Sequence, residues 1–493
     1  MRTSRTFFAT FAVKSLYPRV YSNISVAITS DRATTRPASG ELARDLGVSH
    51  ATAIVIGTII GSGIFLVPSE MMQDVGSARL VYLAWIVGGL LSFFGALTYA
   101  ELGAMRPQAG GEYVYVRDGY GPLAGFLYAW TWFVIAKPAS VATVVTGLVR
   151  ILGTFSVFSF FSSRIFSVPF SFTWGQLVAI SAAILISALN YIGVKKAGEF
   201  QLIFTILKIA IILGIVFVCF SGIGSVTGRG WSNFSGTFIG AKGGIAGFMA
   251  ALVATLWAYD GWNDLNMVGG EVKQPERNIP IALIAGVATV GVLYVLVNAG
   301  VQYVLSASAI AASPRPASDA VAHILGHVGA GIVSAGMALS MLVTLNGTIM
   351  SGARVPYAVA RDRYFFRGLA DVHPRFHTPS TAIVVQAIVS IALLLLGASF
   401  GQLFSLAIFA EWLFYMTAAS TVFVFRLREP NAARPYRMWG YPFVPAIFVL
   451  VAAALLVYTF ENNLPNSAYG LLVILAGIPI FWYFARKRSN SPL

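Results

Sequence analysis

Residues 57–65 read Gly-Thr-Ile-Ile-Gly-Ser-Gly-Ile-Phe, a small-residue stretch inside an apolar segment that covers residues 49–76. A helix needs about 20 apolar residues to cross a bilayer core, and this segment has them. Gly61, Ser62 and Gly63 at its centre predict that the helix is interrupted in the membrane. Backbone groups freed by such a break are costly in lipid, so they are tolerated where a polar ligand pairs with them.

A second interrupted segment follows 200 positions later, where Gly261 stands in Tyr-Asp-Gly-Trp at residues 259–262. The first break lies in the first apolar segment and the second in the sixth, five segments further along, so the two halves of the chain run in inverted orientation. Glycines that only permit close packing or a kink would explain one such stretch. Matching breaks in two inverted halves favour the central substrate site of a transporter instead.

The chemistry of two facing breaks selects a ligand class. The N-terminus of a half-helix offers amide groups and a partial positive charge, which suit a carboxylate. The carbonyl groups exposed on the opposite half suit an ammonium group. An α-amino acid carries both groups on one carbon, so it fits this arrangement.

Composition describes a membrane protein throughout. Of 493 residues, 57% are hydrophobic and 11% are charged, with a mean hydropathy of +0.76, whereas a soluble domain carries about 25% charged residues. We therefore predict an all-α polytopic membrane protein of about twelve transmembrane helices. The predicted spans cover residues 49–76, 79–105, 122–149, 174–192, 198–221, 244–270, 279–305, 328–352, 380–397, 402–425, 442–460 and 467–485.

The net charge of +14 reflects orientation in the membrane. If the N-terminus is cytoplasmic, about 25 of the 33 lysines and arginines lie on the cytoplasmic side. This bias predicts a multi-pass protein of the cell membrane with both termini in the cytoplasm, in contact with lipid and not with nucleic acid. The basic residues on the opposite side are Arg79, Arg150, Arg164, Arg229, Lys242 and Arg315.

Four regions are expected along the chain. Residues 1–47 are rich in Ser, Thr and Arg and form a cytoplasmic tail, either disordered or a targeting peptide. Residues 48–426 form a ten-helix transport core. Residues 427–485 add helices 11 and 12, and residues 486–493 form a cytoplasmic C-terminal tail.

Several motifs resemble the L-type amino-acid transporter family of the amino acid–polyamine–organocation (APC) superfamily. The stretches that carry the resemblance are residues 57–65, 107–122, 190–208, 257–263, 270–280 and 345–354. The resemblance covers residues 42–485 and is closest in type to prokaryotic amino acid permeases. It implies a five-plus-five inverted repeat of the LeuT-like fold, discontinuous helices 1 and 6, and alternating access.

The resemblance also assigns the substrate site. It places the carboxylate on amides around Ser62 and Gly63, and the ammonium group near carbonyls of Ile59 and Trp257. Trp257 corresponds to an aromatic gate over the side-chain pocket. The full set of expected substrate contacts is Ile59, Ile60, Gly61, Ser62, Gly63, Trp257, Ala258, Tyr259, Asp260 and Gly261.

Lys208 lies at the centre of its apolar span, about ten residues from either end, where its ammonium group does not reach the interface. A lysine there costs roughly 2.5–3.5 kcal/mol on insertion scales. Family members carry a lysine where sodium-coupled relatives of the fold hold a cation. The resemblance therefore implies a fixed ammonium group that braces the first break without sodium. The alternative is a lysine that carries a coupling proton.

Other polar residues in the predicted spans are candidates for specificity. Lys137 and Glu411 either pair with each other or face the substrate. Asp260 either accepts hydrogen bonds from freed amides or attracts a cationic side chain. Asn346, in the Leu-Asn-Gly-Thr motif, is a further candidate.

Cys219 is the single cysteine, so neither an internal disulfide nor a cysteine-based metal site can form. We expect no metal and no cofactor. Light chains of animal heteromeric transporters carry a cysteine in the loop after the third span. Residues 150–173 have none, so we expect no disulfide-linked heavy chain.

The leading hypothesis is a sodium-independent exchanger of neutral L-amino acids. The alternatives are a proton-coupled symporter that uses Lys208 and a carrier that also accepts cationic amino acids. A nutrient sensor would be expected to carry a long signalling domain, a channel a continuous polar pore, and a membrane enzyme a nucleophile–base or metal constellation. The sequence shows the signature of none of these three classes.

Overall fold

The computed structural model describes residues 41–166, 172–221, 223, 228–396, 400–462 and 464–489, with the backbone alone for residues 400–408 and 489. These residues belong to one compact unit that begins at Ser39. Residues 1–40 of the predicted tail over residues 1–47, and the last four residues of the chain, lie outside the described parts.

The first part of the chain is helical apart from one short hairpin, in which β1 and β2 pair antiparallel. Its elements are α2 (Val48–Ile59), α3 (Gly63–Val75), α4 (Ala78–Met105), α5 (Glu112–Tyr120), α6 (Pro122–Thr131), the π-helix η1 (Trp132–Ala136), α7 (Lys137–Leu152), the 3₁₀-helix η2 (Ser156–Ser162), β1 (Arg164–Phe166), β2 (Phe172–Thr173), α8 (Trp174–Tyr191) and α9 (Val194–Phe220).

The described remainder of the chain contains helices and connecting segments. Its elements are the 3₁₀-helix η3 (Trp231–Ser235), α10 (Gly244–Ala258), α11 (Asp264–Met267), the 3₁₀-helix η4 (Gly269–Glu271), α12 (Pro275–Val304), α13 (Ala307–Ala312), α14 (Pro316–Gly352), α15 (Arg354–Arg361), the 3₁₀-helix η5 (Arg367–Ala370), α16 (Ser380–Leu395), α17 (Phe400–Arg428), α18 (Phe443–Asn462) and α19 (Leu464–Ser489).

The structure confirms the all-α polytopic class. Within the described ranges, nine helical stretches are long and apolar enough to cross a membrane. Two further apolar helices, α10 and α16, have 15 and 16 residues, and α17 has 29. α10 is short because the predicted break ends it at Ala258. The total of twelve spans therefore stays a prediction.

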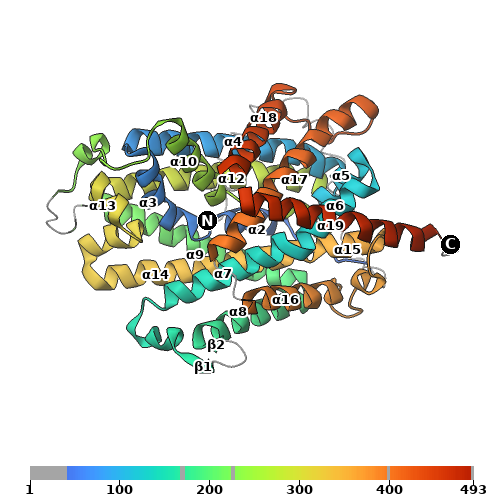
Figure 1. Ribbon diagram of the computed structural model, residues 1–493, viewed down its shortest axis with the longest axis horizontal. Helices are drawn as coiled ribbons and strands as arrows, with labels where there is room; N and C mark the ends of the chain where they lie inside the picture. Colours follow the sequence, from blue (N-terminus) through green and yellow to red (C-terminus); the bar gives the residue numbers. More distant parts are fainter. Residues whose placement is uncertain are drawn as a thin grey trace, which may run out of the picture. The chain divides into compact units, whose positions relative to one another are not determined.

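Short elements mark the two ends of the helical bundle. In Figure 1, α5, α15 and the end of α19 lie toward the right edge of the view, and α13 lies toward the left edge. We call these ends the α5 side and the α13 side. The helices that bear the two predicted breaks cross between them: helix 1 comprises α2 and α3, and helix 6 comprises α10, α11 and η4.

Backbone bridges tie helix 1 to helix 6 at both ends. On the α5 side, Leu46 pairs with Val272, so the segment before helix 1 meets the segment after helix 6. On the α13 side, Ser77 pairs with Thr237, so the segment after helix 1 meets the segment before helix 6. The first bridge is parallel and the second antiparallel, and together they join the flanks of the two helices at both ends of the bundle.

Two glycines allow the close approach that this arrangement needs. A Cβ atom at Gly57 would lie 2.4 Å from Nε2 of Gln201 and 2.5 Å from Oγ1 of Thr205, so a side chain there would displace the side chains of α9 that pack against helix 1. Gly261 has a φ of +102°, a conformation that L side chains rarely adopt, and it redirects the chain between α10 and α11. Both positions bring the breaks together in the middle of the bundle.

Candidate substrate-binding site

The break in helix 1 lies where the sequence predicts it: α2 ends at Ile59 and α3 begins at Gly63. Lys208 reaches it from α9, and its Nζ lies 2.9 Å from the Gly57 carbonyl oxygen and 2.6 Å from that of Ile60. The lysine side chain is buried. Its ammonium group therefore satisfies carbonyls that the interrupted helix leaves without amide partners.

Two hydroxyl groups from α14 also donate hydrogen bonds to the carbonyl groups at this end of α2. Ser340 Oγ lies 2.7 Å from the Ile60 carbonyl oxygen and 3.2 Å from that of Gly61. Thr344 Oγ1 lies 3.2 Å from the Gly57 carbonyl oxygen. The carbonyl end of the break is thus held by α9 and α14 together.

The other half of the break presents the N-terminus of α3. Ser62 is the N-cap residue, and its side chain makes no capping hydrogen bond. Gly63 follows, and a Cβ there would lie 3.0 Å from Cα of Ala258 in helix 6. Because Ser62 and Gly63 also line the central cavity, the positive end of α3 faces that cavity.

Two hydroxyl groups join the break of helix 1 to that of helix 6. Tyr294 Oη on α12 lies 3.1 Å from the Ile59 carbonyl oxygen and 2.8 Å from that of Ala258. Thr58 Oγ1 lies 2.9 Å from the Gly261 carbonyl oxygen. The two breaks are therefore held against each other.

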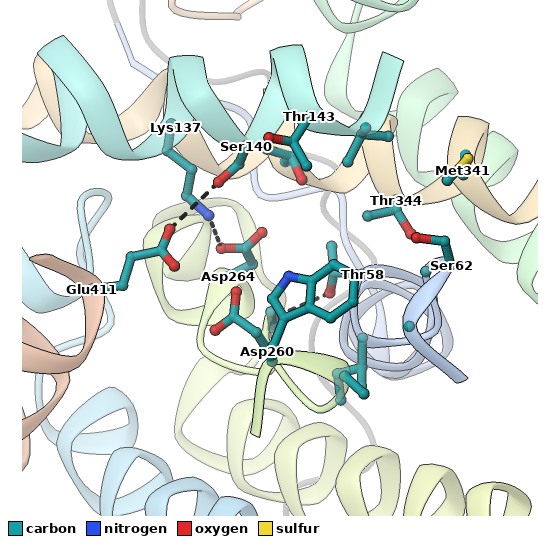
Figure 2. A pocket seen from close by; sticks show the side chains of 18 residues that line it. Thr58, Ser62, Lys137, Ser140, Thr143, Asp260, Asp264, Met341, Thr344 and Glu411 are labelled. Atoms are coloured by element: carbon teal, nitrogen blue, oxygen red, sulfur yellow. Dashed lines mark hydrogen bonds and ion pairs between the residues drawn. The ribbon is translucent and has the colours of Figure 1, made fainter. Parts of the chain in front are cut away.

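Charged side chains gather on one wall beside the breaks (Figure 2). Lys137 Nζ lies 2.5 Å from Oδ1 of Asp264, and both residues are buried. Glu411 accepts a 3.4 Å hydrogen bond from Ser140 Oγ. The ion-pair partner of Lys137 is thus Asp264 and not Glu411, because the turn after the break of helix 6 places Asp264 opposite the start of α7. Asp260 Oδ1 accepts a 2.8 Å hydrogen bond from Tyr415 Oη.

The two breaks and this charged wall enclose a small cavity with a volume of about 100 Å³. It is lined by Thr58, Ile59, Gly61, Ser62, Gly63, Lys137, Ser140, Thr143, Val144, Trp257, Ala258, Asp260, Gly261, Asp264, Met341, Thr344, Thr348 and Glu411.

Comparison with known proteins identifies the family. Residues 46–482 match the family model described as amino acid permease. The chain belongs to the amino acid permease family.

Individual relatives align over nearly the whole permease. It is 32% identical to the serine/threonine exchanger SteT of Bacillus subtilis, over 91% of this chain and 98% of that protein. It is 29% identical to the human b(0,+)-type amino acid transporter 1, over 92% and 90% of the two chains. It is 32% identical to the human large neutral amino acids transporter small subunit 2, over 90% and 80%.

Four residues that the sequence singles out lie behind the cavity of the permease and do not line it. Ile60 turns its carbonyl group toward Lys208 and Ser340. Tyr259 is buried, with its ring centroid 4.9 Å from that of Tyr294. Asn346 donates a 2.7 Å hydrogen bond to Gln201 Oε1 between α14 and α9. Ile60 and Tyr259 belong to the breaks themselves, whereas Asn346 and Lys208 lie on neighbouring helices. Asn346 does not line the cavity, and its role in specificity stays a prediction.

Several lining residues were not expected from the sequence, although their helical periodicity indicates a shared face. Ser140 and Val144 follow Lys137 at three and seven positions, which is the spacing of one helix face. Thr344 and Thr348 repeat this spacing from Met341 on α14. Asp264 gave no such signal, because it begins the short helix α11, whose direction depends on the turn at Gly261.

Proposed function

We propose that the permease exchanges small neutral L-amino acids by alternating access and independently of sodium. The observation that carries the proposal is the pair of helix breaks that face one cavity. A volume of about 100 Å³ suits a small ligand, since pockets for drug-sized ligands span roughly 300–1,000 Å³. The relatives described as exchangers or transporters of amino acids support the same substrate class.

The substrate carboxylate binds at the N-terminus of α3, on the amides around Ser62 and Gly63. Ser62 leaves this helix end uncapped by its side chain, and the helix dipole favours an anion there. The ammonium group lies near the carbonyls of Ile59 and Trp257. Trp257 lines the cavity and closes it over the substrate side chain.

Lys208 acts as a fixed counter-ion for the break in helix 1. Its ammonium group contacts the carbonyls of Gly57 and Ile60, which are neutral groups that a bound cation would otherwise coordinate. A permanently charged brace makes sodium unnecessary. In the competing mechanism, Lys208 releases a proton in one facing state and couples uptake to a proton gradient.

A second candidate function is transport of cationic amino acids. Asp260 and Glu411 both line the cavity, and the cation beside them, Lys137, is already paired with Asp264. The hydrogen bonds from Tyr415 and Ser140 come from neutral groups. If both carboxylates are ionised, they attract a substrate ammonium or guanidinium group. Competition of alanine uptake by lysine and ornithine distinguishes the two candidates.

We assign the α5 side to the cytoplasm, following the bias of basic residues. The permease is expected to work without a disulfide-linked partner and without enzymatic activity. Cys219 is the sole cysteine of the sequence, and it is buried in α9, so it is not positioned to tether a second subunit. Exchange by the purified single chain in proteoliposomes tests this assignment.

Substitution of Gly63 by valine tests the proposed site. A Cβ there would lie 3.0 Å from Cα of Ala258, so a valine would push helix 6 away from the N-terminus of α3 and distort the carboxylate position between them. Exchange of radiolabelled alanine or serine in preloaded proteoliposomes should be lost in Gly63→Val. The matched control is Gly214→Val, since a Cβ at Gly214 meets no atom within 4 Å. Exchange by Gly63→Val at the rate of Gly214→Val would refute the carboxylate assignment.

A further inference from the structure

The short helix α5 contacts helix 6 just after the break of that helix. α5 and the glycines before it pack against the segment that contains α11. Three hydrogen bonds join them: Gly110 N to Met267 O at 2.9 Å, Tyr115 Oη to Asn266 Oδ1 at 3.0 Å, and Asn263 Nδ2 to Glu112 Oε1 at 2.6 Å. We call these contacts the α5 clasp.

The approach of the two segments is as close as their backbones allow. Gly111 has a φ of +48°, and a Cβ there would lie 2.7 Å from the backbone carbon of Asn266 and from the backbone nitrogen of Met267. The clasp is therefore a tight backbone contact, and a sliding movement of α11 past α5 would break it.

The rest of α5 is attached to helices outside helix 6. Tyr128 on α6 donates a 2.8 Å hydrogen bond to Glu112 Oε2. Tyr113 Oη donates a 2.7 Å hydrogen bond to Asp362, which follows α15, and Arg117 forms an ion pair with the same carboxylate. α5 thus connects helix 6 to α6 and α15.

Glu112 is the carboxylic acid of the clasp. Its side chain is fully buried, and its two oxygens accept one hydrogen bond each, from Asn263 and from Tyr128. Burial is the main cause that raises the pKa of Glu112 to about 7, against the opposing effect of these two hydrogen bonds. The other ionisable groups that act on it electrostatically are Lys137 on α7, Asp264 on α11, Tyr99 on α4, Tyr115 on α5 and Tyr415 on α17.

We propose that Glu112 is a positioning residue whose ionised carboxylate keeps the α5 clasp closed on helix 6, and whose protonation loosens it. The inference rests on the proposed function, in which helix 6 must move away from α5 for the substrate to leave on that side. Hydrogen bonds to an ionised acceptor are roughly twice as strong as those between neutral groups. Protonation removes this charge from the bond that Asn263 donates.

The direction of the pH effect follows from the same chemistry. Above pH 7 the carboxylate is ionised and the clasp is closed, so the α5 side opens rarely. Below pH 7 the group is protonated, the clasp weakens and the α5 side opens more often. Opening should therefore increase as the pH falls through 7.

Cysteine labelling measures this opening without relying on transport. The variant carries Cys219→Ala, which removes the native thiol, and Thr348→Cys, which places a single thiol in the cavity wall on α14. A membrane-impermeant maleimide is then added to vesicles in which the permease has either orientation. From the α5 side, labelling should be roughly tenfold faster at pH 5.5 than at pH 8.5, as expected for the weakening of one charge-assisted hydrogen bond. Glu112→Gln, which resembles the protonated acid, should label fast at every pH.

Control variants separate a specific effect from loss of folding. Glu101 on α4 is also a fully buried carboxylate, but its partner is Arg426, so Glu101→Gln should keep the wild-type pH profile. Tyr128→Phe removes one hydrogen bond to Glu112 and should shift the midpoint to higher pH. The proposal would be overturned if Glu112→Gln kept the pH profile of the protein with Glu112. It would also be overturned if labelling of the protein with Glu112 did not depend on pH.

Amino-acid exchange is measured on the same vesicles, with equal pH on both sides. This measurement shows whether the proposed function or the proposed role of the clasp has failed. pH-dependent labelling without any amino-acid exchange would contradict the proposed function and leave the clasp standing. Exchange that ignores pH together with labelling that ignores pH would contradict the clasp and leave the proposed function standing.

Discussion

The two buried lysines of the permease have contrasting surroundings. Lys208 donates hydrogen bonds to the carbonyls of Gly57 and Ile60 at the break of helix 1, and among the described residues no carboxylate lies within ion-pair distance of it. Lys137 contacts Asp264 at 2.5 Å in the cavity wall, close to Glu411. One cation stabilises an interrupted backbone, and the other balances the charge of neighbouring carboxylates.

The contrast shows that a lysine within a membrane span does not define its own role. The partner decides it: neutral carbonyls make Lys208 a substitute for a bound cation, whereas Asp264 makes Lys137 one half of a buried ion pair. Removal of each lysine should therefore damage a different property. Lys208 should matter most for transport, and Lys137 should matter for stability together with its partner.

The largest effect is expected from Lys208→Met. It removes two hydrogen bonds from a charged donor to buried carbonyls, so exchange should fall by roughly 100-fold or more. Sodium should not restore it, because the methionine side chain fills the cation position. Lys195→Met, an exposed position on the same helix, is the control and should exchange normally. Wild-type exchange by Lys208→Met would contradict the role as a brace.

Asp264→Asn should reduce stability by about 3–5 kcal/mol, since it leaves a buried charge without its partner. The double variant Lys137→Met with Asp264→Leu removes both charges and should recover most of this loss. Thermal unfolding of the purified variants checks the order. A double variant less stable than Asp264→Asn would show that the pair itself, and not the orphaned lysine, determines stability.

A smaller effect is expected on selectivity from Glu411→Gln. Loss of one carboxylate from the cavity wall should weaken competition by lysine by up to about tenfold relative to competition by alanine, as one charge-assisted hydrogen bond would. Inhibition of labelled serine exchange measures both competitors. If inhibition by lysine and inhibition by alanine change by the same factor, Glu411 does not face the substrate side chain.

The smallest effect is expected for a third lysine, Lys242, on the α13 side. It pairs with Asp74 at 2.7 Å, but its side chain is 70% exposed, so water and salt screen the pair. Lys242→Ala should change stability by less than about 1 kcal/mol. A loss as large as that of Asp264→Asn would contradict the view that burial separates these ion pairs.

The sequence predicted the parts of the site that depend on local signals. Glycines at 61 and 63 mark the first break, and a lysine far from either end of an apolar span marks Lys208 as functional. Ten residues of the cavity wall were expected, because they lie within or next to the breaks or are charged within a span. These signals need no knowledge of neighbouring helices.

Tertiary contacts account for what the sequence could not predict. Asp264 pairs with Lys137 from 127 positions away, and Glu112 meets Asn263 from 151 positions away. Asp264 and Glu112 each lie beside a glycine-dependent turn, where the direction of a side chain depends on a positive φ at Gly261 or Gly111. Periodicity carries no information about such turns.

Amino-acid accumulation in sodium-free proteoliposomes, empty or preloaded with amino acid, tests most directly whether the permease is an exchanger with a fixed charge on Lys208. With a fixed charge on Lys208, an inward proton gradient should cause negligible accumulation in empty vesicles, and preloading should restore uptake whether the gradient is present or collapsed. Strong accumulation in empty vesicles that disappears when the proton gradient is collapsed would contradict the exchanger and assign Lys208 to proton transfer.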